Sequence, residues 1–113
     1  MPVIDFSNLP DSMPVVEIVE NGKPDVLVPG RRTLPRPGYG EVLIRVAAAG
    51  VNRPDIMQRM GLYPPPDGAS DLPGLEVAGE IAGIGPGVTS FKLSDQVCAL
   101  VAGGGYAAYC LAH

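Results

Sequence analysis

A chain of 113 residues has the length of one small domain. Leu, Ile, Val and Phe make up about 27% of it, which is too much for an intrinsically disordered chain. The 15 glycines and 13 prolines amount to about a quarter of the residues and indicate many turns. The composition therefore predicts a compact, soluble, mainly β domain in which short strands are joined by tight turns.

The charge and the cysteine count exclude several classes of protein. A net charge of −4 argues against nucleic-acid binding and against docking on an anionic membrane surface. The long uncharged stretch 96–113 is interrupted by three glycines at 103–105, so it does not read as a membrane span. The N-terminus, 1–6, carries Asp5 and no basic run, unlike a signal peptide. Two cysteines are too few for a disulfide framework, and we expect a cytoplasmic protein.

The first third of the chain predicts an arm and two strands. Residues 1–14 hold three prolines, and we expect them to form a loosely held N-terminal arm. Residues 15–19 are mostly β-branched and predict a strand that ends at the turn Asn21-Gly22. A second strand is predicted over 26–28, followed by a proline- and glycine-rich loop over 29–40.

The central strand and the helix follow. Residues 41–46 alternate and then stay apolar to Val51, which predicts a strand that is half-buried at first and fully buried later. Residues 52–61 predict a helix of about two turns. Pro54 and Asp55 suit its first turn, and Gly61 suits the position after its last turn. Ile56, Met57 and Met60 share its apolar face.

The last part of the chain predicts a stiff loop and three strands. Three prolines over 64–66 make the loop stiff, and a glycine-spaced strand is expected over 77–84. Two final strands, 96–101 and 106–111, flank the glycine triplet 103–105, which predicts a tight hairpin turn.

The residues give little support for a metal site or for a catalytic triad. The single histidine, His113, ends the chain, and Cys110-x-x-His113 supplies only half of a zinc site. We therefore predict neither a metal site nor a catalytic triad, and two buried structural thiols at Cys98 and Cys110. The glycine clusters lack the following helix that a dinucleotide-binding fingerprint needs.

Two segments carry a family resemblance. Residues 47–63 (AAAGVNRPDIMQRMGLY) and 72–81 (LPGLEVAGEI), followed in order by 85–88 (GPGV) and 94–97 (SDQV), resemble the medium-chain dehydrogenase/reductases. The nearest branch is that of the zinc-independent, zeta-crystallin-like NAD(P)H:quinone oxidoreductases. The resemblance implies that 15–113 form the GroES-like (alcohol dehydrogenase-like N-terminal) domain. Its fold would be a distorted β-barrel with one or two short helices, incomplete at its C-terminal side and lacking the family's separate Rossmann domain.

The departures from the zinc-dependent members are informative. Those enzymes have a cysteine ligand where this chain has Asn52 and a histidine ligand where it has Leu75. Glu76 keeps the family's glutamate, for which we expect an internal ion pair. The cysteine-rich structural zinc insert is absent, and Ser94 replaces the usual glycine of a turn. These departures indicate the zinc-free branch.

The resemblance also implies the site residues. NADPH would lie in a cleft lined by Asn52 and Tyr63, which become the candidate catalytic and cofactor-binding residues. Asp55 and Gln58, on the same helix, are further cofactor-binding candidates. From the residues alone, Asn52 is equally explained as a helix cap and Tyr63 as an aromatic packed on the barrel. For Asp55 the preferred role is structural, the stabilisation of the N-terminal end of the helix.

The predicted function is that of the substrate-side domain of an oxidoreductase that transfers hydride from NADPH to a quinone without zinc. The isolated chain would be inactive without its Rossmann domain and would self-associate through the face left uncovered. Two alternatives remain: reduction of another activated double bond such as an enone, or a non-catalytic GroES-like binding module in the manner of a co-chaperonin.

Overall fold

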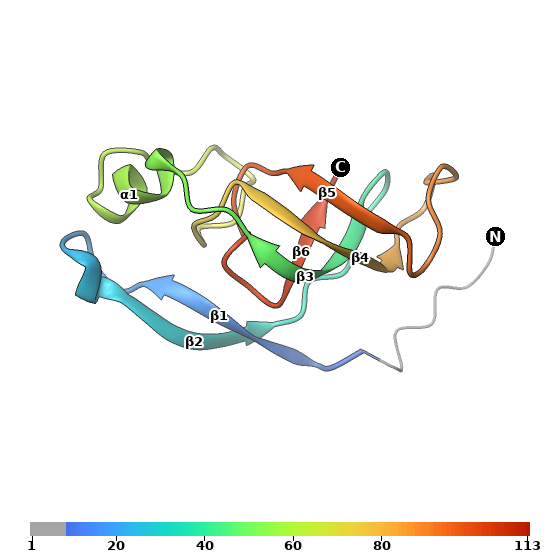
Figure 1. Cartoon of the computed structure of the whole chain (residues 1–113), viewed down its shortest axis with the longest axis horizontal. Helices are drawn as coiled ribbons and strands as arrows, with labels where there is room; N and C mark the ends of the chain where they lie inside the picture. Colours follow the sequence, from blue (N-terminus) through green and yellow to red (C-terminus); the bar gives the residue numbers. More distant parts are fainter. Residues whose placement is uncertain (1–8) are drawn as a thin grey trace.

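The computed structural model describes residues 9–113 and confirms a mainly β fold with one short α-helix (Figure 1). Every strand pair is antiparallel. The elements in chain order are β1 (Ser12–Ile18), the 3-10 helix η1 (Pro24–Val26), β2 (Leu27–Thr33), β3 (Val42–Ala49), α1 (Arg53–Arg59), β4 (Glu76–Ile84), β5 (Gln96–Leu100) and β6 (Tyr109–Ala112).

The strands form two sheets. β1 and β2 make a two-stranded ribbon, and the larger sheet has the order β5-β4-β3-β6. In Figure 1 the ribbon runs below the larger sheet, and α1 lies at one end of the elongated molecule. Segment 106–108 joins the sheets: Val16 donates to the Tyr106 carbonyl (2.9 Å), Ala108 donates to Pro14 (3.0 Å), and Val46 donates to Ala108 (2.9 Å).

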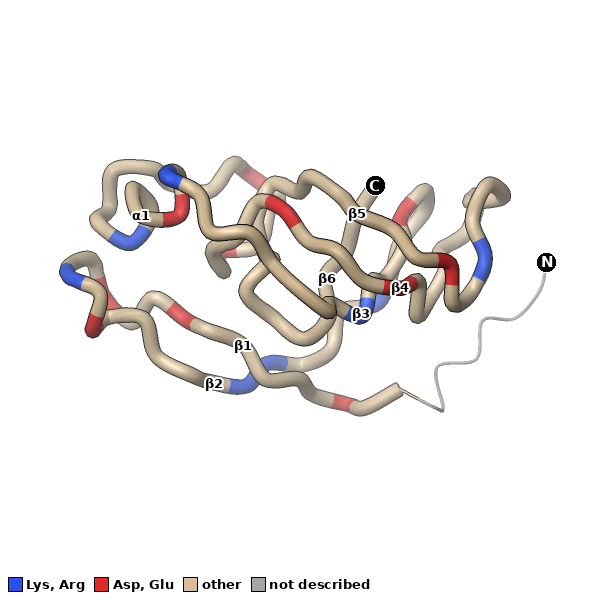
Figure 2. Tube along the Cα trace, viewed as in Figure 1, with Lys and Arg blue, Asp and Glu red and all other residues tan. Residues whose placement is uncertain are grey.

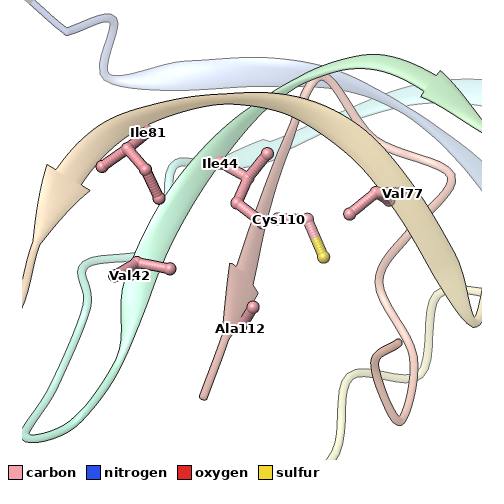
Figure 3. Packing of buried hydrophobic residues seen from close by; sticks show 6 residues of the cluster. All are labelled: Val42, Ile44, Val77, Ile81, Cys110 and Ala112. Carbon is pink, nitrogen blue, oxygen red and sulfur yellow. The ribbon is translucent and has the colours of Figure 1, made fainter. Parts of the chain in front are cut away.

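The main core lies on one face of the larger sheet (Figure 3). Its six buried residues come from β3, β4 and β6, and their centre is Ile44, which is 1% exposed. A second cluster of Met13, Val15 and Leu72 fills the space next to β1. Since β3 contributes to the main core and pairs with both β4 and β6, it is the central element of the fold.

Burial along β3 runs opposite to the prediction. Val42, Leu43 and Ile44 are buried, whereas residues 47–49 are exposed. The reason is that β6 pairs only with the first half of β3, from Val42 to Arg45, so the second half extends beyond it towards α1.

The boundaries of β1 and β2 also differ from the prediction. β1 begins at Ser12 rather than at residue 15, and Met13 is only 4% exposed, so the predicted arm is too long by these residues. Residues 1–8 of the predicted arm lie outside the described residues. The predicted loop over 29–40 is wrong for 29–33, which belong to β2. Pro29 is tolerated there because, among residues 9–113, β2 pairs with β1 alone, and an edge strand does not need every N–H.

The helix forms where the sequence predicts it. Asn52 occupies the N-cap position, Pro54 lies in the first turn, and Gly61 after the helix has φ +82°. The burial of α1, however, is reversed. Its buried residues are Asp55 and Gln58, whereas Ile56 and Met60 are 38% and 46% exposed and Met57 is half-buried, so most of the predicted apolar face points outward.

The predicted hairpin around the glycine triplet is wrong. β5 and β6 lie at opposite edges of the larger sheet, and the triplet instead crosses the segment 72–74. Gly104, Gly105 and Tyr106 donate backbone hydrogen bonds to Leu72, Gly74 and Pro73 at 2.9, 3.1 and 2.9 Å. A Cβ on Gly74, whose φ is +105°, would lie 2.7 Å from the Gly105 Cα, so only glycine permits this close approach.

Two smaller features complete the fold. Ser94 has φ +72°, the left-handed region that favours glycine. Basic and acidic residues are interspersed along the tube in Figure 2. Within residues 9–113, no helix has both the length and the apolar character that crossing a membrane requires.

The two cysteines differ in a way that the sequence did not predict. Cys110 is 2% exposed in the main core, but Cys98 on β5 is exposed, so the prediction of two buried thiols is wrong for Cys98. The side-chain alternation of a strand explains this, because Cys98 shares the outward face with Gln96 and Leu100. Burial raises the pKa of the Cys110 thiol to about 11.

We expect iodoacetamide at pH 8 to modify Cys98 and spare Cys110, because the thiolate is the reactive form and the raised pKa of Cys110 keeps it protonated. Intact-mass analysis should show one adduct on the folded chain, two in denaturant and none on folded Cys98→Ser. Two adducts on the native chain would contradict the burial of Cys110.

Candidate functional site

Asn52 lies where β3 passes into α1. Its backbone is extended (φ −128°, ψ 161°), as an N-cap requires, and its side-chain amide nitrogen Nδ2 donates to Glu76 Oε1 at 3.1 Å. The sheet brings the two residues together, because Gly50 donates its backbone N–H to the Glu76 carbonyl at 3.2 Å. The internal ion pair predicted for Glu76 is therefore wrong: its partner is a neutral amide, and no ion pair among residues 9–113 includes it.

Asp55 holds the first turn of the helix from inside the protein. Its side chain is 4% exposed, and Oδ2 accepts hydrogen bonds from the Asn52 backbone N–H (2.9 Å) and the Tyr106 hydroxyl (2.8 Å). Burial, together with this contact to Asp55, raises the pKa of Tyr106. Asp55 Oδ1 is buried without a hydrogen-bond partner among the described residues. These contacts favour a supporting role for Asp55, and its direct contact with a cofactor stays a prediction.

Gln58 connects the end of the helix to the following loop by a hydrogen bond. Its side-chain Nε2 donates to the Asp71 carbonyl at 2.9 Å. The Asp71 carboxylate in turn pairs with both terminal guanidinium nitrogens of Arg32 on β2, and this hydrogen bonding lowers the pKa of Asp71. Asp71 is therefore held both by α1 and by β2, and these contacts restrain the loop that contains Tyr63.

Tyr63 is 38% exposed and borders an open hollow of about 300 Å³ beside the end of α1. Gln58 borders the same hollow, and Asn52 does not. A seven-residue helix is about 10 Å long, so Asn52 and Tyr63 lie at its opposite ends. The hollow is lined by Ile18, Asn21, Gln58, Gly61, Tyr63, Pro64, Pro65 and Asp71.

The structure thus gathers the four predicted residues in two pairs. Asn52 and Asp55 are joined by a hydrogen bond at the start of the helix, and Gln58 and Tyr63 share the hollow at its end. A larger hollow of about 540 Å³ lies over β3, β4 and β5 beside the Arg45–Glu80 ion pair. It includes none of the four residues.

Sequence reasoning missed Tyr106. It stands 51 positions after Asp55, and only the crossing of the glycine triplet with segment 72–74 brings it to the helix. The only sequence signal for this contact is the glycine triplet 103–105, and by itself the triplet predicts a hairpin turn. Within the described part of the chain, no three His, Cys, Asp or Glu side chains gather closely enough to hold a metal ion.

Comparisons with known proteins agree on one family. The family model described as "Alcohol dehydrogenase GroES-like domain" matches residues 38–113. The quinone oxidoreductase of Rattus norvegicus is 38% identical over 101 residues, which are 88% of this chain and 31% of that protein. The chain therefore spans about a third of the length of the quinone oxidoreductases that it matches.

Solved structures show the same fold. Mycobacterial Rv1454c complexed with NADPH superimposes with a TM-score of 0.76 at 38% identity, covering 88% of this chain and 31% of that one. The CurK enoyl reductase superimposes with a TM-score of 0.77 at 26% identity, covering 91% of this chain and 33% of that one.

The Tyr106–Asp55 contact predicts a stability effect. We expect Tyr106→Phe to lower the free energy of unfolding by about 1–3 kcal/mol, because it removes one of the hydrogen bonds of a buried carboxylate. Urea denaturation followed by circular dichroism measures this effect. Tyr39→Phe is the matched control, since that ring is 79% exposed; equal midpoints for the two variants would contradict the role of the contact.

Proposed function

The chain belongs to the alcohol dehydrogenase GroES-like domain family, and on that premise we propose that it is the substrate-side domain of a longer, NADPH-dependent quinone oxidoreductase. The observation that carries the proposal is the inverted helix α1. Asp55 and Gln58 are buried against the domain, whereas Ile56 and Met60, with Tyr63, are exposed. Such a surface suits a flat, apolar acceptor and a second domain that closes over it.

The donor groups at the start of α1 support hydride transfer without zinc. At the two positions where the zinc-dependent enzymes have cysteine and histidine ligands, this chain has the amide of Asn52 and the alkyl side chain of Leu75. The Asn52 Nδ2 is already hydrogen-bonded to Glu76. An amide engaged in this way and an alkyl group are not a zinc ligand set.

The residues fit only the reactive end of NADPH. The phosphates of a dinucleotide are usually held by a βαβ unit with a glycine-rich turn, and all strand pairs among residues 9–113 are antiparallel. We therefore assign the phosphates to a Rossmann domain outside this chain, and the nicotinamide and acceptor to Asn52 and Tyr63. NADPH supplies the hydride. The Tyr63 hydroxyl would donate a hydrogen bond to the acceptor oxygen, which gains negative charge.

A second candidate is the reduction of an enone, favoured by the likeness to the CurK enoyl reductase. Both reactions add hydride to a conjugated carbonyl system, so the same donor suits either acceptor. We place the protein in a reducing compartment, the cytoplasm, since Cys98 is exposed and neither cysteine is paired.

Two measurements on the natural gene product test the proposal. Its intact mass should be well above that of this chain, and it should oxidise NADPH in the presence of a quinone, or of an enone if the second candidate holds. A natural product of this length without NADPH oxidation would contradict the proposal and favour a non-catalytic binding module.

Tyr63 should matter for turnover and not for folding. We expect Tyr63→Phe in the oxidoreductase to lower kcat/KM for quinones by about 10- to 100-fold, because one donor to the developing oxyanion is lost. The midpoint of urea unfolding should stay unchanged, since the ring is retained. Tyr39→Phe controls for a surface tyrosine. Unchanged kinetics with several quinones would remove Tyr63 from the proposed site.

The outward apolar side chains predict self-association of the isolated chain. Val51, Ile56, Met60 and Leu62 are 38–74% exposed at or beside α1, and such patches mark interaction surfaces. Light scattering over a concentration series should show dimers or larger species. Met60→Ser with Leu62→Ser should shift the mass towards the monomer. Phe91→Ser should not, because Phe91 belongs to the loop between β4 and β5, and this loop lies at the end of the molecule away from α1 (Figure 1). A strictly monomeric chain at high concentration would contradict the prediction.

A further inference from the structure

The turn between β1 and η1 contains the sequence Asn21-Gly22. Both residues lie outside the strands, in a run of bends, and Asn21 is exposed to solvent. A glycine after an asparagine leaves the backbone nitrogen unshielded and lets the backbone rotate freely. That nitrogen can then attack the side-chain carbonyl carbon of the asparagine, so the turn carries a chemically reactive pair of residues.

Two reciprocal hydrogen bonds join this turn to the end of α1. The Gly22 backbone N–H donates to the Arg59 carbonyl at 2.9 Å, and Arg59 Nε donates to the Gly22 carbonyl at 3.0 Å. The Asn21 side chain lies against Gly61, because a Cβ added to Gly61 would be 2.6 Å from Asn21 Nδ2. The nitrogen that would attack Asn21 is therefore engaged whenever the turn is docked on the helix.

We propose that Asn21 is a site of spontaneous deamidation and that the docking of the turn on α1 sets its rate. The Gly22 nitrogen, released from Arg59 and deprotonated, bonds to Cγ of Asn21. The side-chain nitrogen leaves as ammonia and takes up a proton from the solvent. Water then opens the cyclic imide at either of its carbonyl groups and yields aspartate or isoaspartate. The reaction needs no ligand, no enzyme, no oxidant and no reductant.

The other two asparagines of the chain do not combine these features. Asn8 precedes a leucine and Asn52 precedes an arginine, and a side chain on the following residue hinders the attack. The Asn52 amide also donates to Glu76 at 3.1 Å. Deamidation should therefore be confined to Asn21.

The reaction changes the surface beside the helix. Asn21 borders two hollows, the one that includes Tyr63 and a second, of about 310 Å³, beside η1. Either product adds a negative charge there, where Asp71 already borders the first hollow. In isoaspartate the main chain passes through the former side chain and gains one carbon atom, which moves Gly22 relative to α1. Deamidation should therefore weaken the docking of the turn on the helix.

The first test follows the reaction on the folded chain. After incubation at mildly alkaline pH, peptide mapping by mass spectrometry should find aspartate and isoaspartate at position 21 and unmodified Asn8 and Asn52. The rate should rise in proportion to the hydroxide concentration, because the deprotonated nitrogen attacks. Asn21→Gln is the matched control, since the larger cyclic imide of a glutamine forms slowly. A folded chain that stays intact at Asn21 while the reaction goes to completion in urea would overturn the inference.

The second test concerns the control by α1. Arg59→Ala removes one of the two hydrogen bonds and should raise the deamidation rate about 2- to 10-fold, the usual effect of one hydrogen bond. Hydrogen exchange of the Gly22 amide reports the same opening and should accelerate by the same factor. Arg53→Ala, an exposed arginine at the start of the same helix, should change neither rate.

A comparison on the wild-type chain makes the test independent of the folding of any variant. Deamidation should be slower in the native chain than in urea, because docking holds the Gly22 nitrogen on Arg59. Equal rates in the two conditions would show that docking does not control the reaction and would overturn the inference.

Discussion

The crossing of segment 72–74 with residues 103–106 is the constraint on which the other parts of the structure depend. The crossing needs glycine in both segments. A Cβ added to Gly74 or Gly105 would lie 2.7–3.0 Å from backbone atoms of the other segment. After the crossing, the chain runs between the ribbon and the larger sheet, where Tyr106 and Ala108 accept hydrogen bonds from β1 and β3. The same backbone path directs the Tyr106 side chain to Asp55, so one crossing joins the sheets and anchors the helix.

The anchoring of α1 by polar groups has a functional consequence. A short surface helix usually buries its apolar stripe, but here Asp55 and Gln58 are buried and each finds a partner far along the chain. A seven-residue helix has little intrinsic stability, so these specific hydrogen bonds replace the apolar contacts that would normally hold it. The apolar side chains of Ile56 and Met60 are thereby left exposed at the surface.

The sequence predicted those features that depend on neighbouring residues. The bounds of β3 and α1 follow from local periodicity and capping. Features that depend on distant pairing were missed. β2 extends through Pro29 because its other edge is unpaired, β6 joins β3 rather than β5, and the burial of β3 depends on where β6 ends. In the candidate site, local signals located the helix, but nothing in the sequence revealed that Tyr106 reaches it.

The Asn52–Glu76 contact gives a physical reason why the substitutions at this site belong together. Glu76 is a half-buried carboxylate, and no ion pair among residues 9–113 includes it. Such a charge is costly unless it receives hydrogen bonds, and the Asn52 amide supplies one at 3.1 Å. A change to either residue therefore removes a contact that joins the start of α1 to β4.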